Sequence, residues 1–309
     1  MSKILCVASG KGGVGKTLLA AGMACCIARR TSSKVILIDA DPSGKTAELL
    51  VEPGARAKYG WVEYINGVPT PAGRRDVLLE ECLAKSTLAE NLYIIKSTSA
   101  EALVYGGSDY SEDYVSEKVL LFQRFIESFS DFAFVVIDLP ATVTSDHIAY
   151  STLFRTVLVS SYTLPEIMAV KNFKESVEKW VNARRREGIM INHRIEGVIA
   201  NKVEDVKEAE RVAEVVNLPL LGAIPYSVQV EKALERKVPI TVYDPGDPAS
   251  IAIDEIAKKL SGLESYEYEV RGERKRRELR GREVFESWRS RKRFGFNLLR
   301  LLKSVKKSR

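Results

Sequence analysis

A glycine-rich turn near the N-terminus constrains the fold of this chain more than any other feature. Residues 10–17 read Gly-Lys-Gly-Gly-Val-Gly-Lys-Thr and fit the pattern G-x-x-x-x-G-K-[ST]. A short apolar run, residues 4–8, precedes the turn, and a helical pattern, residues 16–30, follows it. Because this order of strand, loop and helix is the setting in which the pattern binds phosphate, we expect a nucleotide-binding α/β domain.

The residue types in this loop suit phosphate chemistry. Glycines allow backbone N–H groups to point at phosphate oxygens, and the N-terminus of the following helix adds its dipole. Lys16 supplies a cation for the β- and γ-phosphates of ATP, and the hydroxyl of Thr17 can bind Mg²⁺. The nucleotide-binding residues expected from the loop are Gly12, Gly13, Val14, Gly15, Lys16, Thr17 and Leu18.

Apolar runs alternate with helical patterns along most of the chain. Strands are expected at 4–8, 35–38, 92–95, 132–137, 157–160, 195–200 and 220–224, and helices at 16–30, 114–129, 166–186, 206–216, 228–235 and 249–260. Strands that are apolar throughout and separated by helices indicate a parallel sheet covered on both faces. We therefore expect one doubly wound, mostly parallel α/β domain over residues 1–262, in which residues 51–90 and 98–113 are the least regular and should contain loops.

Three carboxylates follow the expected strands directly. Asp39 and Asp41 end the second strand, and Asp138 ends the very apolar strand 132–137. The carboxyl ends of parallel strands share one edge of a sheet, so these side chains should lie beside the phosphate loop. A carboxylate there can orient an attacking water or hold the water ligands of a metal ion.

An amide ends another strand. Asn201-Lys202 follows strand 195–200, and an amide can both donate to and accept from the edge of adenine. Guanine-selective proteins use N-K-x-D, whereas the fourth position here is Glu204. The sequence therefore favours ATP over GTP.

These motifs together resemble those of the MinD/ParA class of P-loop ATPases, most closely the MinD-like members. Residues 11–17, Lys-Gly-Gly-Val-Gly-Lys-Thr, resemble that class's deviant phosphate loop, and residues 38–42 and 135–140 resemble its switch I and Walker B segments. Residues 221–226 resemble the L-G-x-I-P segment that borders the base. The resemblance covers about residues 3–262.

The resemblance implies roles for individual residues. Lys11 would reach the phosphates of a partner subunit in an ATP-dependent homodimer, and Asp41 would position or deprotonate the attacking water. Thr17, Asp39 and Asp138 would form the Mg²⁺ site, and Pro225 would border the base beside Asn201 and Lys202. Hydrolysis would be slow without an activating protein partner, which the sequence does not identify.

The sequence also departs from parts of the class. Residues 43–46 read Ser-Gly-Lys-Thr, where partition-type members often carry Gln-Gly-Asn, which weakens a specific assignment to ParA. The four cysteines, Cys6, Cys25, Cys26 and Cys82, form no C-x-x-C pair. This argues against the iron–sulfur carriers, the nitrogenase iron protein and the zinc-bridged targeting ATPases, and against a disulfide framework.

The C-terminal segment differs from the body in charge. Residues 1–262 hold 31 basic and 34 acidic residues, whereas residues 287–309 hold nine basic and no acidic ones. Residues 263–286 are mixed in sign and are expected to form a linker or solvated helix. At helical spacing, one face of the last segment is apolar and the opposite face is basic. The residues expected to meet a membrane are Phe294, Leu298, Leu301, Leu302 and Val305, with Arg300 and Lys303 on the basic face.

Such a segment is typical of a helix lying on an anionic membrane surface. It also suits a nucleic-acid arm or a helix that docks on protein, and these alternatives stay open. The chain holds no apolar run long enough to span a bilayer and no signal-peptide pattern, so we expect a cytoplasmic protein with reversible peripheral membrane association. Three functions are compatible with these patterns: a MinD-like positioning ATPase, a ParA-like DNA-segregation ATPase, and a metabolic P-loop enzyme.

Overall fold

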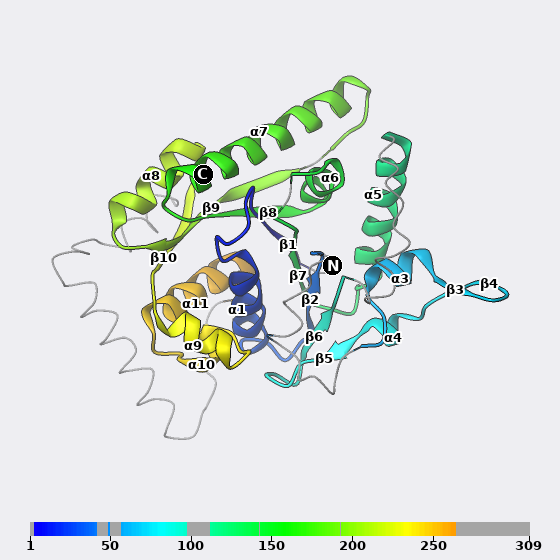
Figure 1. Cartoon of the computed structure of the whole chain (residues 1–309), viewed down its shortest axis with the longest axis horizontal. Helices are drawn as coiled ribbons and strands as arrows, with labels where there is room; N and C mark the ends of the chain where they lie inside the picture. The colour runs from blue at the N-terminus through cyan, green and yellow to red at the C-terminus, as the bar shows by residue number, and fades with distance from the viewer. Residues whose placement is uncertain are drawn as a thin grey trace.

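The structure is a computed structural model that describes residues 3–41, 49, 57–97, 112–141, 143–191 and 193–263, leaving aside the side chains of 112–118 and 146. A sheet of eight strands in the order β10-β9-β8-β1-β7-β2-β6-β5 forms its centre (Figure 1). These strands are β1 (Lys3–Ala8), β2 (Val35–Asp39), β5 (Ala84–Lys85), β6 (Leu92–Ile95), β7 (Phe134–Asp138), β8 (Arg155–Ser160), β9 (Arg194–Val203) and β10 (Leu220–Pro225). All neighbours pair in parallel except β5 and β6, which are antiparallel.

Helices cover both faces of the sheet. One face carries α1 (Lys16–Ala28), α9 (Gln229–Glu235), α10 (Ile240–Tyr243) and α11 (Pro248–Ser261) (Figure 1). The other carries α3 (Trp61–Asn66), α5 (Glu112–Glu127), α6 (Ser145–Leu153), α7 (Leu164–Arg186) and α8 (Val206–Val216). Alternation along β1 divides the core, since Leu5 and Val7 pack on the first face and Cys6 and Ala8 on the second. The doubly wound fold expected from the sequence is confirmed.

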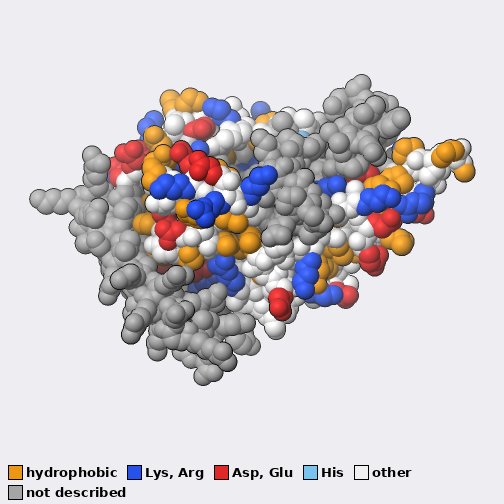
Figure 2. Space-filling model, turned by 60° about the horizontal axis from the view of Figure 1, so that its bottom comes forward, with side chains coloured by type: hydrophobic (Ala, Val, Ile, Leu, Met, Phe, Trp, Pro, Cys, Tyr) orange, Lys and Arg blue, Asp and Glu red, His pale blue; other side chains and the backbone are white. Residues whose placement is uncertain are grey.

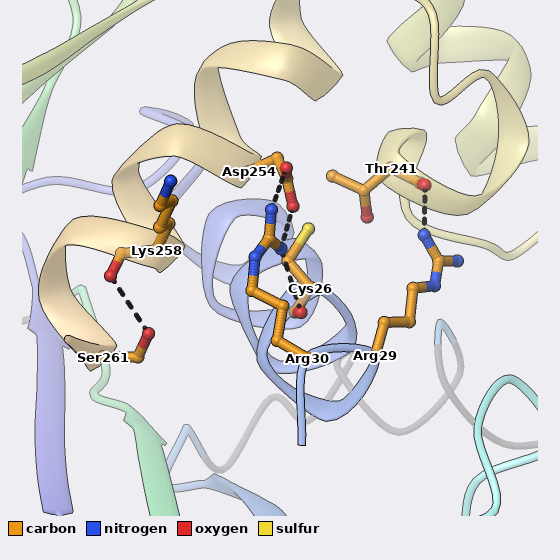
Figure 3. Close-up of polar contacts among 7 residues, drawn as sticks. All are labelled: Cys26, Arg29, Arg30, Thr241, Asp254, Lys258 and Ser261. Carbon is orange, nitrogen blue, oxygen red and sulfur yellow. Dashed lines mark hydrogen bonds and ion pairs between the residues drawn. The ribbon is translucent and has the colours of Figure 1, made fainter. Parts of the chain in front are cut away.

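Polar contacts fix α1 to its neighbours on the first face (Figure 3). The guanidinium of Arg30 forms a two-pronged ion pair with Asp254 of α11. Arg29 Nη1 donates to the carbonyl of Thr241 in α10 at 2.9 Å. These contacts hold the C-terminal end of α1 against α10 and α11.

The seven expected strands are present, and their bounds shift by no more than a few residues. The structure adds several short elements that the sequence patterns did not predict. They are a hairpin of β3 (Val68–Thr70) and β4 (Gly73–Arg75), which extends away from the body (Figure 1), and α3, α4 (Leu79–Cys82), β5, α6 and α10. Within residues 57–90 these short elements alternate with loops, as expected for one of the least regular parts of the domain. Most of these elements span only two to six residues, which is too short for hydrophobic periodicity to reveal.

Within the described residues, no helix combines the length and apolar character needed to cross a membrane. The expected linker and amphipathic tail, residues 263–309, lie outside the described residues from 264 onward. The membrane-facing residues predicted there, Phe294 to Val305, are therefore not placed by the structure.

Candidate nucleotide-binding site

The phosphate loop connects the end of β1 to the start of α1. Gly15 adopts φ 90° and precedes the first helical residue, Lys16. A Cβ at Gly15 would lie 2.2 Å from Asn201 Nδ2, and one at Gly10 would lie 2.0 Å from the carbonyl oxygen of Ala169 in α7. The two positions therefore require glycine, Gly15 for its left-handed conformation and both for the close approach of neighbouring elements.

The N-terminus of α1 suits an anion. Its first residues carry no side-chain cap and its first turn holds no acidic residue. The first N–H groups of a helix have no partner within the helix, and the helix dipole places partial positive charge at that end. With the glycine turn in front of it, this helix end forms a cradle for phosphate oxygens.

Lys16 and Asp138 form a buried ion pair behind the loop. Lys16 Nζ lies 2.6 Å from Asp138 Oδ1, and the two side chains are 4% and 0% exposed. Both were predicted to bind ligand, Lys16 the phosphates and Asp138 the metal. In this structure the two charges face each other, and we expect them to separate when nucleotide and metal bind.

The carboxylates predicted for the metal site are brought together. Asp39 and Asp138 stand opposite each other in the register of β2 and β7, and both are buried. The Asp41 backbone N–H donates to Asp39 Oδ1 at 3.0 Å, which ties the segment after β2 to this edge. Carboxylate oxygens and the hydroxyl of Thr17 are the hard ligands that Mg²⁺ prefers, so this donor set fits that ion. Among the described residues there is no cluster of three His, Cys, Asp or Glu that suggests another metal centre.

Asn201 and Lys202, near the end of β9, contact the backbone of the phosphate loop. Asn201 Nδ2 donates to the carbonyl of Val14 at 2.7 Å, and Lys202 Nζ donates to the carbonyl of Gly13 at 2.7 Å. Pro225, at the end of β10, pairs with Val203 in register. Asn201 and Lys202 thus contact the loop, and contact of Asn201 with adenine and of Pro225 with the base stays a prediction.

Glu166, at the start of α7, is a site residue that the sequence patterns did not single out. Its carboxylate accepts hydrogen bonds from the hydroxyls of Ser161 and Thr163. Burial favours a higher pKa for Glu166, but these hydrogen bonds, with the charges of Lys11 and Lys202, outweigh it and hold the pKa below its usual range. Thr163 and Glu166 stand in the spacing of a helix capping box, which was the available sequence signal.

Exposed apolar side chains surround this edge of the sheet. They follow the carboxyl ends of three strands: Val143 after β7, Tyr162, Leu164 and Met168 after β8, and Tyr226 and Val228 after β10. Lys11 is exposed on the loop among them, whereas Lys16 is buried. We call these six residues the apolar rim.

Comparisons with known proteins agree with this fold. The family model of the CobQ/CobB/MinD/ParA nucleotide binding domain matches residues 5–240. The chloroplastic septum site-determining protein minD homolog of Arabidopsis thaliana is 30% identical over 268 residues, which cover 84% of this chain and 74% of that protein. Among solved structures, the septum site-determining protein MinD complexed with Mg-ADP from Pyrococcus horikoshii has a TM-score of 0.64 at 20% identity, covering 84% of this chain and 96% of that one. The MinC:MinD cell division protein complex of Aquifex aeolicus gives 0.62 at 20% identity, covering 88% and 100%.

Proposed function

The chain belongs to the CobQ/CobB/MinD/ParA nucleotide-binding family, and from that premise we propose that it is an ATP-dependent switch: it binds Mg-ATP, dimerises in that state, and separates after slow hydrolysis. The observation that carries the proposal is the difference in burial between the two lysines of the loop. Lys16 is buried beside the metal-binding carboxylates, where it can serve the chain's own nucleotide. Lys11 is exposed among the apolar rim, where it can serve the nucleotide of a second copy.

The residues of the site have distinct tasks in this mechanism. Loop N–H groups and the start of α1 bind the phosphates, and Lys16 leaves Asp138 to neutralise phosphate charge. Thr17, Asp39 and Asp138 would hold Mg²⁺ and its water ligands; the ion, when bound, neutralises charge that develops on the phosphates. Asp41 orients the attacking water, since a carboxylate can accept its proton.

Dimerisation would cover the apolar rim. Scattered exposed apolar side chains are normal on a protein surface, but these six all follow the carboxyl ends of three strands of one sheet. Burying them against a second copy would close the site against water and place Lys11 beside the partner's phosphates. Because this interface forms around nucleotide, the dimer depends on ATP.

We further propose that the ATP-bound dimer is recruited to an anionic membrane surface as a MinD-like positioning ATPase. The support comes from the sequence of residues 287–309 and from relatives named as septum site-determining proteins. Each Lys or Arg near an anionic surface contributes about 1 kcal/mol of attraction and the apolar side chains add to it, so we infer that one tail binds with marginal to moderate affinity. Two tails on one dimer bind much more tightly by avidity, which makes membrane binding dependent on ATP. An unidentified protein partner would then trigger hydrolysis.

A ParA-like DNA-segregation ATPase is the alternative. The nine basic residues of the tail, with no acidic ones, favour it. In the view of Figure 2, basic and acidic side chains of the described residues lie interspersed, so the described residues visible there form no continuous basic surface for a duplex. DNA binding would therefore depend on the tail's cations and not on its apolar face.

One experiment separates the two functions. The full chain, with ATP or ADP, is sedimented with vesicles of phosphatidylglycerol and phosphatidylcholine and, in parallel, tested on duplex DNA of random sequence. Leu298→Glu alters the apolar face of the tail, and Leu299→Glu, about 100° around the helix, is the matched control. The membrane proposal predicts ATP-dependent vesicle binding that Leu298→Glu abolishes and Leu299→Glu largely keeps. ATP-dependent DNA binding by all three proteins, without vesicle binding, would establish the alternative.

A further inference from the structure

A lysine in an unusual backbone conformation ties the phosphate loop to β9. Lys202 has φ 60°, in the left-handed region that residues with a Cβ seldom adopt. Among the described residues only Asn217 and Lys237 share this feature without being glycine, and both lie at the ends of helices, where chains commonly turn. Lys202 instead lies near the end of β9, at a bulge where the pairing with β10 passes from Asn201 to Val203, and a bulge re-aims the side chain that it carries.

The conformation lets two consecutive side chains reach the same loop. In a regular strand, successive side chains point to opposite faces of the sheet. Here Asn201 and Lys202 donate to neighbouring carbonyls, those of Val14 and Gly13, each at 2.7 Å. The Lys202 backbone N–H also donates to Asn201 Oδ1 at 2.9 Å, which fixes the two side chains relative to each other.

Holding these carbonyls determines where the loop's N–H groups point. A trans peptide unit is planar, and its C=O and N–H point in opposite directions. When the carbonyls of Gly13 and Val14 are held toward β9, the N–H groups of the same peptide units, those of Val14 and Gly15, must point away from β9. Those N–H groups belong to the glycine-rich cradle described above.

We propose that Lys202 is a positioning residue for nucleotide binding and does not bind the nucleotide itself. Its amine orients the N–H group of Val14 by holding the carbonyl of Gly13. Its backbone N–H fixes Asn201, which holds the carbonyl of Val14 and so orients the N–H group of Gly15. The inference rests on the proposed binding of nucleotide at this loop. Glu166, whose carboxylate interacts with the charge of Lys202, supplies the countercharge from α7. Local strain of this kind persists where the surrounding contacts over-determine it, as the three hydrogen bonds do here.

The test compares variants of Lys202 with variants of a lysine in the same conformation. Lys237 has φ 54° and an exposed side chain after α9, so Lys237→Met and Lys237→Gly are matched controls. Affinities for ADP, ATP and GTP are measured by calorimetry on the full chain with Mg²⁺. Lys202→Met should weaken ADP and ATP by the same factor, about tenfold for the loss of one charge-assisted hydrogen bond. The ratio of ATP to GTP affinity should stay unchanged.

Two further variants separate the amine from the backbone conformation. Lys202→Arg keeps a cationic donor and should restore most of the affinity. Lys202→Gly fits the left-handed conformation without a side chain, so it should bind nucleotide as weakly as Lys202→Met while unfolding at the same or a higher temperature. Both Lys237 variants should bind nucleotide as the natural chain does.

Hydrogen exchange on the nucleotide-free chain tests the geometry directly. In Lys202→Met the amides of Val14 and Gly15 should exchange faster than in the natural chain, while those of β9 keep their rates. Affinities within twofold of the natural chain, or unchanged exchange in the loop, would overturn the proposal. A loss of affinity for ATP but not for ADP would mean that Lys202 contacts the γ-phosphate. A changed ratio of ATP affinity to GTP affinity would mean that Lys202 contacts the base. If the natural chain binds no nucleotide, the proposed function fails, whereas the exchange result still decides whether Lys202 holds the loop.

Discussion

Removing one partner of the buried Lys16–Asp138 pair should destabilise the nucleotide-free chain strongly. At 2.6 Å the two charges attract by about 6 kcal/mol at an effective dielectric constant of about 20. Desolvation of both groups offsets most of this attraction, so the pair itself adds little net stability. A single substitution is different because it leaves the other charge buried, which costs about 3–5 kcal/mol.

That loss is large relative to the free energy of unfolding of the chain. Native proteins are stable by about 5–15 kcal/mol, so Asp138→Ala should remove a substantial part of the free energy of unfolding. The corresponding fall in melting temperature is roughly 6–20 °C for a domain of this size. Glu187→Ala is the control, since it breaks an exposed pair with Arg184 at 2.9 Å and should cost less than about 1 kcal/mol.

A double-mutant cycle in urea, without nucleotide and with EDTA, isolates the pair. Lys16→Met, Asp138→Ala and the double variant are compared with the natural chain. The double variant should be more stable than the sum of the single effects predicts, by about 2–3 kcal/mol, since it leaves neither charge uncompensated. Additive single effects would refute the reasoning, because they would mean that the two charges do not interact in the empty site.

Three other predictions follow from the site and the core. Gly15→Ala should destabilise the chain by about 1–3 kcal/mol and abolish ADP binding, because alanine at φ 90° is strained and its Cβ would overlap Asn201. Urea unfolding measures the loss of stability and calorimetry measures ADP binding. Normal binding of ADP would contradict the loop geometry. Lys202→Met should raise the pKa of Glu166, because the charge of Lys202 is one cause of the low pKa of that carboxyl group. Carbon-13 NMR titration of the Glu166 carboxyl measures this pKa. An unchanged pKa would mean that the two charges do not interact. Burial raises the pKa of Cys6, Cys25 and Cys82 to about 12 and the pKa of Cys26 well above its ordinary value. A thiol reagent at pH 8 should therefore label none of the four cysteines in the native chain and all four in urea. Rapid labelling of the native chain would show that this core opens readily.

Much of the site could be predicted because a few rules act over short stretches of sequence. The phosphate loop is contiguous, and strands that are apolar throughout end at the polar residues they deliver to one edge. This places Lys16, Asp39, Asp138 and Asn201 together without any knowledge of side-chain contacts. The same reasoning gives the parallel sheet and its two helical layers.

The remaining features depend on contacts between distant parts of the chain. The pairing of Lys16 with Asp138 joins residues 122 positions apart, and the clamp of Lys202 on Gly13 joins residues 189 apart. The left-handed backbone at Lys202 lies at a bulge in the pairing of β9 with β10, which the local sequence does not indicate. Among the short elements between residues 57 and 97, α3 packs on α5 and β5 pairs with β6, and periodicity does not record such contacts.

The central claim is that ATP joins two copies of this chain through Lys11, and the molar mass in solution tests it most directly. Light scattering coupled to gel filtration is run on the full chain with Mg²⁺ and a non-hydrolysable ATP analogue, with bound nucleotide quantified in each peak. The natural chain should elute at twice the mass of one copy, and Lys11→Ala should bind the analogue yet remain at the mass of one copy. A natural chain that holds the analogue as a single copy, or a Lys11→Ala variant that dimerises equally well, would contradict the claim.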